Sequence, residues 1–213
     1  LIEKYPNARL RTDGEFVGLP IGQMGNSEVG HLNIGAGRVV YQDLVKINKA
    51  CEDNSIATNI ELLKAFEYAK KHNKQVHFLG LVSNGGIHSH QNHLIKLCQI
   101  AAKAGVEKSF IHAFTDGRDT DPNSGIGFLE AVEKAIEDFP TKVATVIGRY
   151  FAMDRDLRWE RIRKAYDLMV YGKGASANSA EEVFQQSYEN KITDEFIEPH
   201  FIADKEGRPI TTL

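Results

Sequence analysis

Short apolar runs alternate with longer amphipathic stretches along most of the chain. The runs at residues 76–82, 109–114 and 142–147 predict strands, and the stretches at 89–103, 122–138 and 154–171 predict the helices that follow them. An earlier helix is predicted over residues 59–72. Alternation of this kind is typical of a parallel sheet with crossover helices. The predicted fold class is therefore α/β, with a mostly parallel sheet.

The residues before Gln42 follow another pattern, because they are rich in glycine and predict loops around short helical turns. We therefore assign residues 1–41 to a different domain and residues 42–213 to the α/β domain. The chain lacks an initial methionine and is expected to begin inside a longer protein. A turn signal at residues 204–209 predicts a further strand, which would start where the sequence stops.

Composition excludes several classes of function. A net charge of -3 and a pI near 6.3 leave no basic excess for a nucleic-acid backbone. No apolar run approaches the roughly 18 residues of a membrane helix, so we expect a soluble protein without a membrane partner. Cys51 and Cys98 show neither metal-ligand spacing nor a disulfide framework, which predicts free thiols.

Polar clusters follow each of the three predicted strands, and they contain His88, Arg118, Asp119, Arg149 and Arg155. In open α/β sheets the carboxyl ends of the strands are where ligands bind. Guanidinium groups grip phosphate and carboxylate in a planar, bidentate way. The sequence therefore predicts one pocket for a small ligand that carries both groups.

Other interpretations of these residues stay open. The three arginines could instead pair with Asp119, Asp154 and Asp156 at the surface, although their placement on three equivalent loops favours the pocket. The spacing of His88, His90 and His93 would allow a metal site, but no cysteine or carboxylate pair completes it. The alternative makes His88 a phosphate donor and lets the other two cap or line the next helix. Two further groups are read as structural, namely a solvated helix face (Arg158, Arg161, Arg163) and satisfied sheet residues (His77, His112).

Glycines also punctuate residues 22–37, but this stretch lacks the G-K-[ST] of a P-loop and the third glycine of a dinucleotide fingerprint. What remains is Ser27, between Asn26 and Glu28. A serine becomes a nucleophile only when a base or metal activates it. A helix N-cap is the alternative, and physical chemistry alone favours the N-cap.

Residues 19–38 closely resemble the signature of the cofactor-independent phosphoglycerate mutases, through Gln23-Met24-Gly25-Asn26-Ser27-Glu28-Val29-Gly30-His31. The resemblance continues over 84–90, 116–119, 148–150 and 153–156 and covers essentially the whole chain. It implies part of an alkaline-phosphatase-like catalytic domain, followed by most of an inserted substrate-binding domain. Ile21 and Asn84 depart from the family pattern at positions without a chemical role.

The resemblance also implies a reaction, namely the interconversion of 3- and 2-phosphoglycerate through a phosphoserine intermediate, without a bisphosphoglycerate cofactor. It makes Ser27 the nucleophile and a ligand of one of two manganese ions, and Asp119 a residue that moves the proton. His88, Arg118, Arg149 and Arg155 would bind the substrate. The family's other metal ligands lie outside this chain, so we expect the chain alone to be inactive, and the intact enzyme to be a cytoplasmic monomer. The alternatives are another phosphatase-like phosphomutase or hydrolase, and a non-enzymatic domain that binds a phosphorylated acid.

Overall fold

The computed structural model describes residues 3–213, which form two compact units that divide between Thr58 and Asn59. The N-terminal unit contains only short helical elements, which are η1 (Gly14–Val17), α1 (Ser27–Ala36), α2 (Asp43–Glu52) and η2 (Ser55–Thr58). Its small core consists of Val17, Leu19 and Val29. The side chain of Asn33 links two segments of this unit, because its Nδ2 donates to the Val17 carbonyl and its Oδ1 accepts from the Val40 backbone amide.

The glycine-rich region is thus more regular than expected, since α1 is a full helix of ten residues. The helix α2 belongs to the N-terminal compact unit, although it follows the boundary assigned from glycine content. The assignment of residues 1–41 and 42–213 to two domains of a larger protein stays a prediction.

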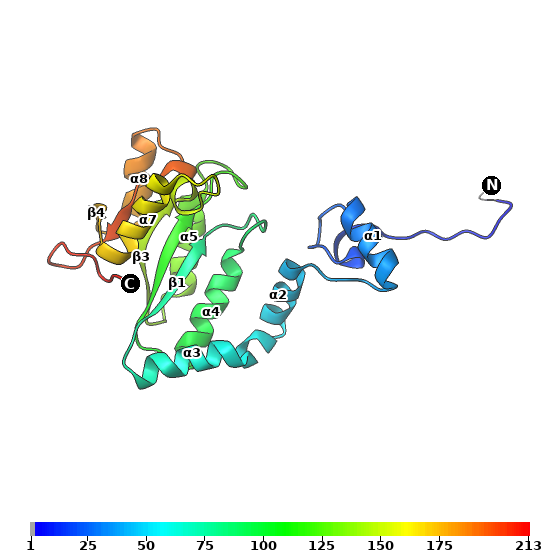
Figure 1. Ribbon diagram of the computed structural model, residues 1–213, viewed down its shortest axis with the longest axis horizontal. Helices are drawn as coiled ribbons and strands as arrows, with labels where there is room; N and C mark the ends of the chain where they lie inside the picture. The colour runs from blue at the N-terminus through cyan, green and yellow to red at the C-terminus, as the bar shows by residue number, and fades with distance from the viewer. Residues whose placement is uncertain (1–2) are drawn as a thin grey trace. The chain divides into compact units, whose positions relative to one another are not determined.

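The second unit is built on one five-stranded sheet with the strand order β1-β2-β3-β5-β4 (Figure 1). Strands β1 to β3 are mutually parallel, β5 runs antiparallel to β3, and β4 is parallel to β5. The predicted α/β class with a mostly parallel sheet is confirmed. The elements in chain order are α3 (Ile60–Lys71), β1 (Val76–Leu81), α4 (Gln91–Lys103), β2 (Ser109–Thr115), α5 (Gly125–Ala135), β3 (Thr141–Gly148), α6 (Arg149–Ala152), α7 (Trp159–Tyr171), β4 (Ala175–Ala177), α8 (Ala180–Glu189), η3 (Asp194–Phe196) and β5 (His200–Ile202).

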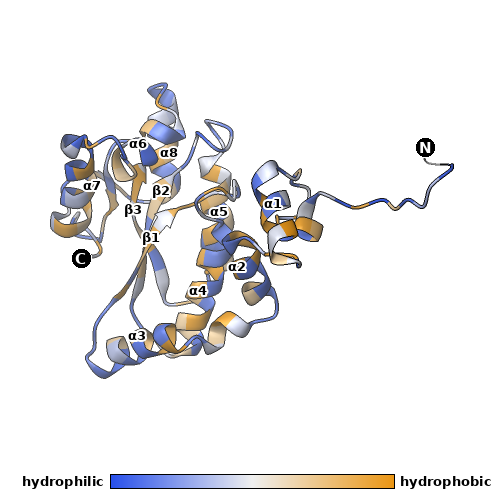
Figure 2. Cartoon of the chain, turned by 45° about the vertical axis from the view of Figure 1, so that its right-hand side comes forward, coloured by the Kyte–Doolittle hydropathy of each residue, from blue (hydrophilic) through white to orange (hydrophobic). Residues whose placement is uncertain are grey.

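Apolar side chains alternate along the strands and fill both faces of the sheet. On one face Ile111 and Ala113 of β2 pack with α4, α5 and α8. On the other face Ile147 of β3 packs with Phe151 and with Leu168 of α7. Figure 2 shows α7 on one side of the strands and α4 and α5 on the other, with blue and orange bands on the amphipathic helix α7. Helices therefore cover the sheet on both faces, and the polar loops lie at the ends of its strands.

Helix ends explain most of the agreement between prediction and structure. The Asn59 side chain caps α3 by accepting from the amides of Glu61 and Leu62. The chain leaves α4 through Gly105, whose positive φ of 79° suits a residue without a Cβ. Each capping residue stands in the sequence next to its apolar pattern, so these helices could be predicted to within a few residues.

The long helix predicted over 154–171 was wrong at its start, since α7 begins at Trp159 and a separate short helix, α6, precedes it. The intervening loop is organised by Asp154, whose Oδ2 accepts from the amides of Asp156 and Arg158. The sequence analysis also missed β4, β5, η3 and α8. The turn at residues 204–209 is present, with a bridge between Ala203 and Pro209, and the described residues beyond it form no strand.

A row of polar side chains crosses three strands on the α7 side of the sheet. The His112 ring lies between Thr145 Oγ1 and His77 Nδ1, at 2.9 Å from each, and His77 Nε2 lies 3.1 Å from Gln75 Oε1. The amide oxygen of Gln75 only accepts, so His77 donates from Nε2 and accepts at Nδ1, and His112 donates to it. Both histidines are thus satisfied sheet residues, as predicted.

This row makes the stability of the α/β unit depend on pH. Burial, with His77 adding a smaller effect, lowers the pKa of His112 from 6.5 to about 4. Between those values the unfolded chain binds a proton that the folded chain does not, so stability falls as the pH drops from 6.5 towards 4. The expected loss in the free energy of unfolding is about 3 kcal/mol.

Urea denaturation of the chain at about pH 7 and about pH 4.5 measures this loss. His112→Gln keeps a polar side chain without a titrating ring, and we expect the difference between the two pH values to shrink by most of that amount. An unchanged difference in the variant would show that other groups cause the acid sensitivity.

Candidate active site

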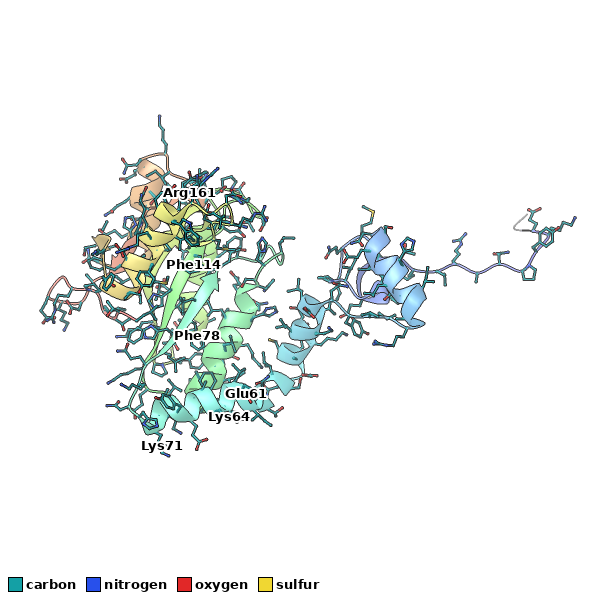
Figure 3. The ribbon with its side chains drawn as sticks, viewed as in Figure 1. Glu61, Lys64, Lys71, Phe78, Phe114 and Arg161 are labelled. Carbon is teal, nitrogen blue, oxygen red and sulfur yellow. The ribbon has the colours of Figure 1, made fainter. Side chains whose placement is uncertain are left out.

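The loops that follow β1, β2 and β3 carry the polar residues singled out from the sequence, and the structure places these loops at the carboxyl ends of parallel neighbouring strands. In Figure 3 Arg161 is labelled beyond Phe114, towards these strand ends, whereas Lys71 of α3 marks the opposite end. Side-chain hydrogen bonds join all three loops. The expected gathering of side chains at one edge of the sheet is therefore present for the first, second and third loops.

Arg149 is the central cation at these strand ends, and its side chain is only 5% exposed. Its Nη1 donates to Asp116 Oδ1 and to Asp119 Oδ2, each at 2.6 Å. Burial lowers the pKa of Arg149, but the bonds to Asp119 and Asp116 outweigh burial and raise it. One cation thus ties the end of β3 to the loop after β2. Its bonds hold the site together.

Asp116 is the matching buried anion, and it is bound from several sides. Ser83 Oγ donates to its Oδ2 at 2.6 Å, and the amides of Arg118 and Asp119 donate to its Oδ1. Burial raises the pKa of Asp116, yet the hydrogen bonds from Ser83, the Asp119 amide and Arg149 more than offset it, so the pKa lies below its ordinary value. Asp116 therefore links the loops after β1 and β2.

The rim of the site is formed by more exposed groups. Arg118 donates through Nε to Glu195 Oε1 at 3.0 Å and also pairs with that oxygen through Nη2. His88 Nε2 lies 3.7 Å from Asp119 Oδ2, so an imidazole from the first loop faces the carboxylate of the second. His88, Arg118, Asp119 and Arg149 are thus brought together around one network of charges.

The loop after α6 holds Arg155 and its neighbours. Arg155 is exposed, and it makes no hydrogen bond or ion pair to the part of the chain that the structure describes. Arg161, which was read as part of a solvated face, is instead 17% exposed; it stacks over the Tyr150 ring and lies 3.4 Å from Asp154. Of the alternative pairs with Asp119, Asp154 and Asp156, the structure forms the one between Arg149 and Asp119, but this arginine is buried rather than exposed. Arg155 pairs with neither Asp154 nor Asp156.

Among the described residues, the histidines after β1 are not gathered as a metal site, and one of them caps the next helix. His90 Nδ1 accepts from the Asn92 amide and caps α4, as expected, and its ring lies 5.7 Å from that of His93. Burial lowers the pKa of both rings. Within residues 3–213 no three His, Cys, Asp or Glu side chains are gathered as a metal site.

Ser27 lies in the N-terminal unit as the first residue of α1. The N-cap is Asn26, whose side chain accepts from the Val29 amide, so the interpretation of Ser27 as the cap was wrong. Ser27 Oγ lies 3.1 Å from His31 Nδ1, but that nitrogen is also 2.7 Å from the Ser27 carbonyl oxygen. A carbonyl oxygen only accepts, so Nδ1 carries a proton and cannot take the proton of the hydroxyl. Activation of Ser27 requires another group.

Three residues of this network had no predicted role, namely Ser83, Asp116 and Glu195. Asp116 directly follows a buried strand, and Ser83 stands one residue beyond the predicted strand before it, so their positions were a usable signal. Glu195 belongs to a three-residue helical turn far along the chain, and no periodicity marks it. Cys98 is a free thiol, as predicted, and burial raises its pKa to about 12.

The fold and these contacts define an α/β protein with guanidinium groups collected at the carboxyl edge of a mostly parallel sheet. The family model described as the N-terminus of the BPG-independent phosphoglycerate mutase matches residues 47–213. The chain belongs to the BPG-independent phosphoglycerate mutase family, and the predicted resemblance is confirmed.

Relatives that carry the name 2,3-bisphosphoglycerate-independent phosphoglycerate mutase include those of Bacteroides thetaiotaomicron, 58% identical over 97% of this chain, and Moorella thermoacetica, 52% identical over 100% of it. A crystal structure of Leishmania mexicana phosphoglycerate mutase at low cobalt concentration matches 96% of the chain with a TM-score of 0.80 and 33% identity. The chain spans 41% of the Bacteroides relative, 42% of the Moorella relative and 39% of the Leishmania chain. None of the helices described is both long and apolar enough to cross a membrane.

Proposed function

We propose that this chain supplies the nucleophile and much of the substrate-binding surface of a phosphoglycerate mutase. The enzyme would be an isomerase that interconverts 3- and 2-phosphoglycerate in glycolysis and gluconeogenesis, as a cytoplasmic monomer. The observation that carries the proposal is the convergence of Arg118, Arg149, His88 and Asp119 at one sheet edge. Membership of the mutase family supports the same reaction.

The reaction needs a group that takes the phosphoryl group from one hydroxyl of glycerate and returns it to the other. After releasing its hydroxyl proton to solvent, Ser27 Oγ would attack phosphorus while the bond to the glycerate oxygen breaks, giving a phosphoserine. The released oxygen gains a proton, and the second hydroxyl loses one when it takes the phosphoryl group back. Asp119 would move this proton, because its carboxylate is partly exposed and faces the loop of His88.

The remaining site residues would bind the substrate. Arg155 offers a guanidinium without a partner among the described residues, and Arg118 keeps N–H groups beyond those used by Glu195. His88 would donate to the phosphate. Arg149 lies among them, but its bonds to Asp116 and Asp119 make the holding of Asp119 its larger contribution.

A metal would activate the serine and neutralise the phosphoryl oxygens. The described part of this chain gathers no three suitable ligands, so it does not fit a complete metal site. Ser27 would contribute one ligand to one of two manganese ions, and the others would come from parts of the enzyme that this chain does not span. We propose that the chain alone does not turn over substrate.

Calorimetric titration of the chain with 3-phosphoglycerate tests the binding half of the proposal. We expect binding that requires the phosphate, so glycerate should not bind measurably. Arg155→Ala should weaken binding by roughly 10- to 100-fold, because it removes charge-assisted hydrogen bonds to an anionic ligand.

The control is Arg158→Ala, since Arg158 is an exposed arginine of the same loop that bonds the described residues through its backbone alone. Equal losses in both variants would mean that general positive charge attracts the ligand, and the assigned role of Arg155 would be wrong. Tight binding without any effect of Arg155 would favour a different pocket.

A further inference from the structure

The short turn η3 lies between the two loops that carry Arg118 and Arg149. The Thr115 hydroxyl donates to the Asp194 carbonyl at 2.6 Å, and the Gly148 amide donates to the Ile197 carbonyl at 2.7 Å. Residues 194–197 are thus bonded to the last residue of β2 on one side and to the last residue of β3 on the other.

Glycines allow this close approach. A Cβ at Gly117 would lie 2.7 Å from the Glu195 nitrogen, and one at Gly148 would lie 2.7 Å from the Glu195 carbonyl carbon. Gly117 also has a φ of 65°, which side chains rarely adopt. The backbone of Glu195 therefore packs directly against the residues that precede Arg118 and Arg149.

The side chain of Asp194 bonds η3 to the two helices α5 and α8. Its Oδ2 accepts from the Gly125 amide at 2.7 Å, and its Oδ1 accepts from the Tyr188 hydroxyl at 2.5 Å. Asp194 itself is fully buried. The adjoining Glu195 is consequently held on a rigid base rather than on a free loop.

From this base the Glu195 carboxylate reaches Arg118. One oxygen, Oε1, accepts from both Nε and Nη2 of the guanidinium, and the Glu195 side chain is only 14% exposed. A guanidinium has five N–H groups in one plane. Hydrogen bonds along its Nε edge therefore fix the orientation of that plane and leave the N–H groups of the other edge for a ligand.

We propose that Glu195 is a positioning residue, which holds the Arg118 guanidinium in the orientation that presents its Nη1 edge to an oxyanion of the substrate. The identity of that substrate rests on the proposed function, but the hold of Glu195 on Arg118 does not. Glu195 also adds a negative charge near an anionic ligand, and this opposes binding. The effect of the hydrogen-bond acceptor on binding and the effect of the negative charge must therefore be separated by experiment.

Two variants separate them, because Glu195→Gln and Glu195→Ala both remove the charge and only Gln keeps an oxygen that can accept from Arg118. We expect 3-phosphoglycerate to bind Glu195→Ala about 3- to 10-fold more weakly than Glu195→Gln, which is the cost of ordering one long side chain on binding. Equal affinities of the two variants would overturn the proposal.

A second comparison tests whether Glu195 acts through Arg118. In an Arg118→Ala background the difference between the Gln and Ala variants should vanish, whereas a role in supporting the loops would leave it unchanged. The control pair is Glu198→Gln and Glu198→Ala, because Glu198 bonds Lys164 at the surface two residues beyond η3. These two variants should bind alike.

A readout without ligand keeps this inference apart from the proposed function. The Nε–H proton of Arg118 should give a slowly exchanging NMR signal in the wild type and in Glu195→Gln, and should exchange rapidly in Glu195→Ala. Slow exchange in Glu195→Ala would overturn the positioning role. Failure of the wild type to bind phosphoglycerate, with the NMR pattern as expected, would instead count against the proposed substrate, and the affinity comparison would then use inorganic phosphate, where equal affinities again overturn the inference.

Discussion

A chimera in which this chain replaces the matching 41% of the Bacteroides thetaiotaomicron relative is expected to lose its mutase activity when Ser27 is replaced by alanine. The expected loss is roughly 10⁴-fold or more, because an enzyme that forms a covalent intermediate has no second route when its nucleophile is removed. The measurement is the rate of conversion of 3- into 2-phosphoglycerate by the unsubstituted and substituted chimeras.

The structure makes this test selective for chemistry. Asn26, and not Ser27, caps α1, so Ser27→Ala should leave the helix in place. Asn26→Ala is the matched control: it removes the cap and should cost about 1 kcal/mol of stability with a far smaller effect on the rate than loss of the nucleophile. A Ser27→Ala chimera that keeps its activity would contradict the phosphoserine route and would favour a protein in which this loop only binds anions.

The second large effect is expected from Arg149→Met. The substitution keeps an apolar stem but leaves the buried Asp116 and the partly exposed Asp119 without their shared cation. Loss of one partner of a buried ion pair costs about 3–5 kcal/mol, since the remaining charge is uncompensated. Urea denaturation, followed by the fluorescence of Trp159, the only tryptophan of the chain, measures the change in the free energy of unfolding.

The pH dependence of this variant has a definite sign. Without Arg149 the pKa of the buried Asp116 carboxyl rises, so the destabilisation is full at neutral pH and decreases as the pH falls through the range in which Asp116 takes up a proton. Arg163→Met is the control, because Arg163 bonds Asp167 on the exposed surface of α7 and should cost less than about 1 kcal/mol. Similar losses in the two variants would contradict the central role assigned to Arg149.

The parallel half of the sheet could be predicted because each of its strands is a mostly apolar run bounded by polar residues. The runs after Gln75 and Lys108 correspond to β1 and β2, which are hydrogen-bonded in register along their whole length. By contrast β4 and β5 have three residues each, which is too short for a periodic pattern. Helix α8 did carry a signal, since Ser179 caps it through the Glu182 amide in an S-x-x-E sequence.

The part of the site that lies on the loops after the parallel strands could be predicted. Arginines and a histidine after successive parallel strands must converge, because those strands end at the same edge of the sheet. The sequence could not distinguish the buried Arg149 from the exposed Arg155, since the difference depends on Asp116 and on how deeply each loop folds back. It also gave no sign of Glu195, because the contact with Arg118 joins residues 77 positions apart.

The bonds from Thr115 to Asp194 and from Gly148 to Ile197 also fix the order in which the site is assembled. During synthesis both arginine loops are made before residues 194–197. Strands β1, β2 and β3 can pair at that stage, and Arg149 can bond Asp116 and Asp119, but Arg118 still lacks Glu195. The arrangement around Arg118 is therefore completed only when the chain returns through η3, and a nascent chain that stops before Asp194 would have the sheet without the contact that orients Arg118.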